Sequence, residues 1–123
     1  MGRWMFALAT AIAIALNPNI AKAEMTVKQL LKDYDDGTAD NRRFIEMLIS
    51  QTENGFSWAN TYLDTSRHEA RLYCVPDKFV LTGNQIIETL RREIEDSPKL
   101  AEAPFGYGIL VVNMRVFPCK NSN

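Results

Sequence analysis

The chain has 123 residues, with 14 basic against 15 acidic side chains and 46% hydrophobic residues. This length leaves no room for a (β/α)₈ barrel or for two independent cores of usual size, so we expect one small domain. A formal net charge of -1 argues against a nucleic-acid-binding protein, which normally carries a basic stripe.

The first 23 residues have the parts of a secretory signal peptide. Arg3 supplies a basic start, residues 6–16 form an apolar run, and Ala21-Lys22-Ala23 is an Ala-x-Ala cleavage site. An apolar run of 11 residues reaches only about half of a ~30 Å hydrocarbon core, which is too short for a membrane anchor. We predict cleavage after Ala23. The mature chain, residues 24–123, is then a periplasmic single domain of 100 residues with a formal charge of -3 and no stable membrane anchor.

The chain has two cysteines, Cys74 and Cys119, and both lie in the part that we expect to be exported. Because export leads to a compartment that permits disulfides, we predict that they pair. The alternatives are a nucleophilic thiol, which needs a nearby His base, and a zinc site, which needs three or four ligands. Both are disfavoured, since His68 is the only histidine.

Two helices are predicted in the first half of the mature chain. Residues 26–29 form a capping box, so a helix should start at Val27 and end at Asp36-Gly37, where Gly37 can accept a left-handed conformation. Apolar residues then recur at spacings of three and four, which predicts one helix of about 24 residues from near residue 41 to residue 64. A bend could occur in it at Asn54-Gly55.

The residue pattern of the next part of the chain predicts an irregular connection followed by a third helix. Residues 66–81 have no periodic pattern and read as an irregular connection that the disulfide fixes. Residues 82–85 form a second capping box, followed by an apolar stripe that begins at Ile86. Ser97-Pro98 should end this helix.

The last part of the chain permits two interpretations. Residues 98–108 hold two prolines and two glycines, which predicts a mobile loop in which Gly106-Tyr107-Gly108 is a hinge. Residues 109–117 alternate like a strand but also fit one face of a helix. With three good helix signals before it, we favour a fourth helix. The predicted fold is therefore all-α, a small bundle of about four helices stapled by one disulfide.

Catalytic motifs are missing from the sequence. It has no Gly-x-Ser-x-Gly, no phosphate-binding loop and no His-Glu-x-x-His, and His68 lies in a polar run typical of the surface. The acidic residues Glu46, Glu53 and Asp64 are best interpreted as a solvated helix face, because no cleft is indicated for a carboxylate pair. We therefore expect a non-enzymatic protein that needs no cofactor or metal and acts by binding.

The second half of the chain resembles the Rap/Tai family, the small periplasmic immunity proteins of type VI secretion systems. The resemblance covers roughly residues 44–119. The segments that carry it are Arg71-Leu72-Tyr73-Cys74-Val75-Pro76, Leu81-Thr82-Gly83-Asn84-Gln85 and Val116-Phe117-Pro118-Cys119. It implies an all-α fold with one disulfide, a homodimer, and a role in blocking a peptidoglycan amidase effector.

In that family a loop between helices enters the groove of the amidase. The corresponding segment here is residues 97–107, and the resemblance suggests Glu102, Phe105 and Tyr107 as contacts with the partner. Aromatic side chains in such a loop supply contact area at low entropic cost.

Two other functions remain open at this point. One is a periplasmic binding protein without enzymatic activity, for example a subunit of an envelope complex. The other is an acid-stress chaperone similar to HdeA, which is also small, helical, periplasmic and held by one disulfide. A chaperone of this kind would dissociate and expose apolar surface at low pH.

Overall fold

The computed structural model describes residues 24–120, so the predicted signal peptide lies outside the described residues. This part of the chain folds into α-helices and one short 3₁₀ helix. The elements are α2 (Val27–Asp36), α3 (Ala39–Thr65), α4 (Gly83–Asp96), η1 (Pro98–Glu102) and α5 (Phe105–Val116). The described residues contain no strand, only an isolated bridge between Thr26 and Pro104. The predicted all-α fold is confirmed, and so is the Cys74–Cys119 disulfide.

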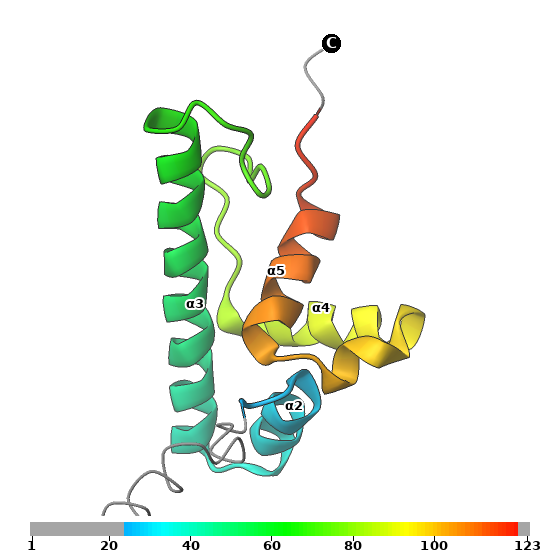
Figure 1. Ribbon diagram of the computed structural model, residues 1–123. Coiled ribbons are helices and arrows are strands. Elements are labelled where there is room, and N and C mark those ends of the chain that lie inside the picture. Colours follow the sequence, from blue (N-terminus) through cyan, green and yellow to red (C-terminus); the bar gives the residue numbers. More distant parts are fainter. Residues whose placement is uncertain (1–23, 121–123) are drawn as a thin grey trace, which may run out of the picture.

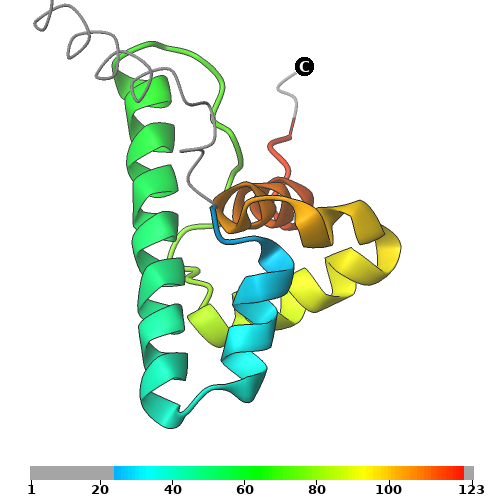
Figure 2. The same cartoon turned by 60° about the horizontal axis from the view of Figure 1, so that its bottom comes forward.

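Helix α3 stands at one side of the molecule, and α2, α4 and α5 gather around its N-terminal half (Figure 1). Its C-terminal half continues past them and faces residues 66–82, which we call the connection, as these run back towards α4. Figure 2 shows α2 beside α3, with α4 passing behind α2. No helix within residues 24–120 is both long and apolar enough to span a bilayer.

Both predicted capping boxes are present and start their helices as expected. The Thr26 hydroxyl accepts from the Gln29 N–H, and the Gln29 side chain accepts from the Thr26 N–H. Thr82 and Gln85 make the same pair of bonds at the start of α4. The helices then bury one apolar face each in a common core. Its fully buried members are Val27, Leu30, Ile45, Ile49, Ile86, Ile87, Leu90, Ile109 and Val112.

Gly37 ends α2 as predicted, but the expectation that it adopts a left-handed conformation is wrong. Its φ is -81° and its ψ 161°, which is extended backbone. A Cβ at this position would lie 2.5 Å from the Asp33 carbonyl oxygen, closer than real contacts allow. Glycine is therefore needed because the chain leaves α2 close to its last turn.

Helix α3 is one uninterrupted helix, so the bend that the sequence allowed at Gly55 does not occur. The prediction of a mobile loop at residues 98–108 is also wrong. Part of this segment is η1, and α5 already begins at Phe105, so Gly106 and Gly108 lie inside a helix and form no hinge.

Backbone hydrogen bonds explain why residues 98–108 are ordered. The Val27 N–H donates to the Ala103 carbonyl at 2.9 Å, and the Phe105 N–H donates to the Met25 carbonyl at 3.0 Å. Leu100 in η1 is also buried. The fourth helix that we favoured over a strand is confirmed, and it starts four residues earlier than expected.

Candidate binding site

The three predicted partner contacts lie where η1 meets α5, but they do not form one surface. Glu102 is exposed and lies 3.7 Å from the Lys28 ammonium, and Tyr107 is exposed in the first turn of α5. Phe105 is half-buried and packs against the core. The structure therefore leaves Glu102 and Tyr107 open to a partner and uses Phe105 largely for folding.

Helix α5 carries apolar side chains on both of its faces. Its inner face holds the buried residues Ile109 and Val112. The opposite face, which we call the α5 outer face, consists of Tyr107, Leu110, Val111 and Met114. Tyr107 and Met114 on it are exposed, and the other two are half-buried. A helix that is apolar all round is normally covered on all sides, so this face is a candidate contact surface.

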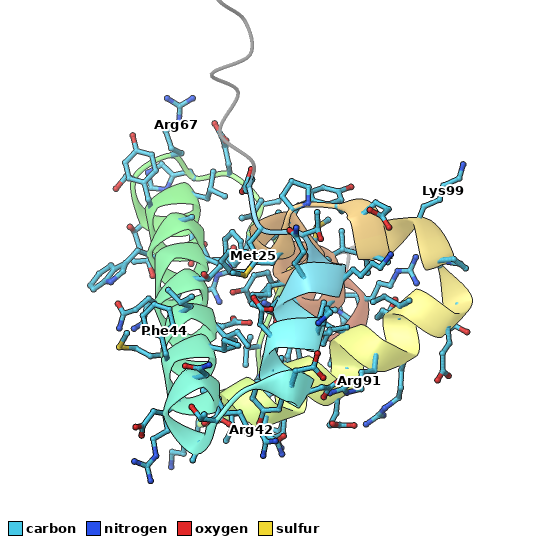
Figure 3. All side chains as sticks on the ribbon, turned by 90° about the horizontal axis from the view of Figure 1, so that it is seen from below. Met25, Arg42, Phe44, Arg67, Arg91 and Lys99 are labelled. Atoms are coloured by element: carbon cyan, nitrogen blue, oxygen red, sulfur yellow. A yellow bond between two sulfur atoms is a disulfide. The ribbon has the colours of Figure 1, made fainter. Side chains whose placement is uncertain are left out.

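A second apolar surface lies on α3, on the side away from the core. Its residues recur at spacings of three and four, and we call them the α3 stripe: Phe44, Met47, Gln51, Gly55, Trp58 and Tyr62. All six are exposed, and Trp58 is 74% exposed. Figure 3 labels Phe44 near one end of the stripe. Exposed aromatic residues in one row are typical of protein contact surfaces.

The connection is irregular, as predicted, and polar contacts hold it in place. The Asn60 side chain on α3 accepts from the Leu72 N–H at 2.7 Å and donates to the Tyr73 carbonyl at 3.1 Å. The Cys74 N–H donates to the Phe117 carbonyl at 2.8 Å, next to the Cys74–Cys119 disulfide. The connection is thus tied to α3 on one side and to the end of α5 on the other.

A pocket of about 400 Å³ lies between the C-terminal half of α3, the connection and the end of α5. We call it the α3–connection pocket. Its α3 wall is polar and includes Ser57 and Thr61, whereas the wall from the connection is apolar and includes Val75, Phe79 and Val80. Phe79 packs edge-on against Phe117, with ring centroids 5.5 Å apart.

Three polar side chains from different elements meet at the inner end of this pocket. They are Glu53 on α3, Tyr73 in the connection and Asn113 on α5. Asn113 on α5 is only 1% exposed and donates from Nδ2 to Oε1 of Glu53 on α3 at 2.8 Å. Asn113 Oδ1 is also buried and has no hydrogen-bond partner among the described residues. Buried amide oxygens normally have a donor, so this atom needs an explanation.

Burial sets the protonation behaviour of this cluster. It raises the pKa of Glu53, although the bonds from Asn113 and Tyr73 act in the opposite direction. Burial, and then the neighbouring Glu53 carboxylate, raises the pKa of Tyr73 to about 12. Tyr73 is therefore a neutral hydrogen-bond donor at any physiological pH, beside a carboxylate that is costly to ionise.

The interpretation of the acidic residues on α3 as a solvated face is wrong for Glu53. It is half-buried and bonded to α5, and Glu46 accepts a hydrogen bond from the Tyr34 hydroxyl at 2.8 Å. The position of Asn113 in the sequence could have indicated this cluster. It lies four residues after Ile109, on the buried face of α5, where a polar side chain is unexpected.

Other chemistry has little support among the described residues. No group of three His, Cys, Asp or Glu side chains between residues 24 and 120 comes close enough together to hold a metal ion. His68 is exposed, as predicted. Comparison of the chain with protein-family models, with curated proteins and with solved structures finds no match.

Proposed function

We propose that the protein is a periplasmic immunity protein that binds and blocks a peptidoglycan amidase effector of type VI secretion. The class of partner comes from the resemblance of the Leu-Tyr-Cys-x-Pro and Phe-Pro-Cys segments to the Rap/Tai family. In support of it, the cysteines of these two segments, Cys74 and Cys119, are bonded to each other in an all-α domain.

The α5 outer face is the observation that carries a binding role. A soluble helix with Tyr107, Leu110, Val111 and Met114 away from the core leaves apolar area in water. Glu102, at the end of η1, is a further exposed residue that the resemblance suggests as a partner contact. A protein that covers this surface would bury the apolar side chains and keep Glu102 at the polar rim.

We place the implied homodimer on the α3 stripe. In an antiparallel pair of α3 helices, Phe44 of one copy would meet Tyr62 of the other, and Met47 would meet Trp58. These pairs are symmetric about residues 51–55, as a twofold interface requires. Gly55 lies near the centre, and a Cβ there would meet nothing within 4 Å, so two backbones could approach closely.

An amidase effector encoded beside the gene would be the first partner to test. We expect the purified protein to bind this amidase and to stop its hydrolysis of peptidoglycan. Met114→Lys should weaken binding at least about tenfold, because it places a charge in the centre of the buried surface. Arg92→Ala, at an exposed position of α4, is the matched control and should bind like the wild type. The proposal fails if the wild-type protein neither binds nor inhibits.

The dimer needs its own measurement. Trp58→Glu should convert the protein to a monomer in light scattering, whereas Ser50→Glu should leave the dimer intact, since Ser50 is exposed on α3 outside the stripe. A wild-type protein that is monomeric at all concentrations would remove the dimer but leave inhibition of the amidase open.

A further inference from the structure

The α3–connection pocket holds one amide oxygen without a hydrogen-bond donor and one carboxylate without a cation partner. Its charged groups are Glu53, Asp64 and Arg71. Arg71 is already occupied, because it donates two hydrogen bonds to Asp64 Oδ2 at 2.6 and 3.2 Å. No cation among residues 24–120 lies within ion-pair distance of Glu53, and Asn113 Oδ1 has no donor. The pocket therefore presents a carboxylate that has hydrogen-bond donors but no cation partner, and an amide oxygen that has no donor.

A ligand that satisfies both atoms must bring several N–H groups and a positive charge. Removal of a carboxylate from water is costly unless a cation replaces the water, and a guanidinium or ammonium group does this with its own donors. Tyr73 adds a neutral hydroxyl beside the carboxylate, and its pKa of about 12 keeps that hydroxyl protonated. The chemistry of the inner end thus selects an organic cation.

The walls of the pocket fit the stem of a long basic side chain. Val75, Phe79 and Val80 form an apolar wall, which can pack against the methylene groups of Arg or Lys. Phe79 is also placed to contact a guanidinium plane. On the opposite wall, the hydroxyls of Ser57 and Thr61 can replace water at the rim.

The surroundings of the pocket favour a protein as the source of this side chain. Val80 is 80% exposed and Phe79 is 46% exposed, so exposed apolar surface borders the polar centre on the side of the connection. A protein partner can cover this surface and so exclude water from a charged contact beside it. The pocket also uses Asn113 and Phe117 at the end of α5, the helix whose opposite side carries the α5 outer face.

We propose that the α3–connection pocket accepts an Arg or Lys side chain of the protein partner, with its charged end at Glu53 and Asn113 Oδ1. This inference rests on the proposed function for the identity of the partner, but the pocket can be tested without it.

The first test uses small probes and NMR. N-acetyl-arginine N-methylamide added to the ¹⁵N-labelled protein should shift the amide signals of Asn113, Tyr73 and Phe79 in a saturable way. The corresponding citrulline compound, which has the same shape without the charge, should not. Glu53→Gln should weaken binding of the arginine probe at least about tenfold, because it removes the charge and keeps an acceptor for Asn113. Glu95→Gln, at an exposed site on α4, is the control and should bind like the wild type.

Three results would overturn the inference. They are a wild-type protein that shows no saturable shift, a citrulline compound that binds as well as the arginine compound, and a Glu53→Gln variant that binds like the wild type. A second test measures the affinity of Glu53→Gln for the amidase. If the wild type binds the amidase and Glu53→Gln binds it equally well, the pocket is excluded and the proposed function stands. If no amidase binds but the arginine probe does, the chemistry of the pocket is supported and the proposed function fails.

Discussion

The two halves of this small domain are held together by different interactions. We call residues 25–54 and 83–112 the core half, and residues 55–82 and 113–119 the disulfide half. Of the thirteen buried hydrophobic residues in the described part of the chain, only Tyr73 and Phe117 belong to the disulfide half. One half is stabilised by apolar burial, and the other by a covalent bond and a few side-chain hydrogen bonds.

This difference explains where the α3–connection pocket lies. A packed apolar core leaves little room to change shape, whereas a segment with few buried contacts keeps polar groups and open volume near its surface. The α3–connection pocket lies mostly in the disulfide half, with Glu53 and Asn54 at its border with the core half. The core half thus supplies most of the buried apolar residues, and the disulfide half supplies most of the lining of this pocket.

Loss of the disulfide should cause the largest change in stability, and it should affect the disulfide half more than the core half. The paired change Cys74→Ser and Cys119→Ser opens a loop of 46 residues. It should lower the free energy of unfolding by about 4 kcal/mol in the chain-entropy model. Amide hydrogen exchange should rise first in the connection, while the amides of α4 keep more protection. Urea unfolding measures the total loss in the free energy of unfolding. Equal loss of hydrogen-exchange protection in both halves would contradict the division into a core half and a disulfide half.

A second pair of changes tests the packing of the core half at two nearby glycines of α5. A Cβ at Gly108 would overlap with Val27 Cγ2, whereas a Cβ at Gly106 would meet nothing within 4 Å. We therefore expect Gly108→Ala to lower the free energy of unfolding by about 2 kcal/mol. Gly106→Ala should raise it by about 0.5 to 1 kcal/mol, because alanine favours the helix. Thermal unfolding of both variants measures these changes in the free energy of unfolding. Similar effects at the two positions would show that the core half is not tightly packed.

A substitution at Asn60 tests whether hydrogen bonds hold the connection against α3. Asn60→Ala removes two bonds to the backbone of residues 72–73 and should lower the free energy of unfolding by about 1 to 2 kcal/mol. Exchange of the Leu72 amide should become faster. Ser50→Ala, at an exposed position of the same helix outside the α3 stripe, should leave both measurements unchanged. An unchanged Leu72 amide would show that the disulfide alone places the connection.

The smallest expected effect is the pH dependence from Glu53. Burial raises the pKa of this carboxyl, so the folded protein holds the proton more tightly than the unfolded chain. Stability should therefore fall as the pH rises from the ordinary pKa of a glutamate through the raised value. Glu53→Gln removes this titration and should be more stable than the wild type by roughly 0.5 to 1 kcal/mol at pH 7. The difference should shrink towards acid pH in urea unfolding. A difference that grows towards acid pH would contradict this assignment.

The sequence predicted the core half better than the disulfide half, for a physical reason. The starts of α2 and α4 depend on local capping boxes at Thr26 and Thr82, and local bonds can be recognised from spacing. The η1 segment was missed because its order comes from bonds to Met25 and Val27, more than seventy residues away in the chain. Long-range pairing of this kind leaves no local pattern.

The candidate site was predictable only in part. The cysteine pair followed from the sequence. Glu53 was not recognised, because its partner Asn113 is sixty residues away and on another helix. A carboxylate on a long helix looks solvated until the element that covers it is known.

The position of the disulfide in the chain also has a consequence for the timing of folding. Cys119 follows Cys74 by 45 residues, and α4, η1 and α5 all lie between them. In a chain that leaves the membrane N-terminus first, Cys74 is an unpaired thiol until the whole of this segment has emerged. If the chain is exported in this way, Cys74 can during that interval form a disulfide only with a thiol of another molecule, because Cys119 is the other cysteine of the chain. The yield of correctly folded protein would then depend on how soon Cys119 emerges relative to oxidation.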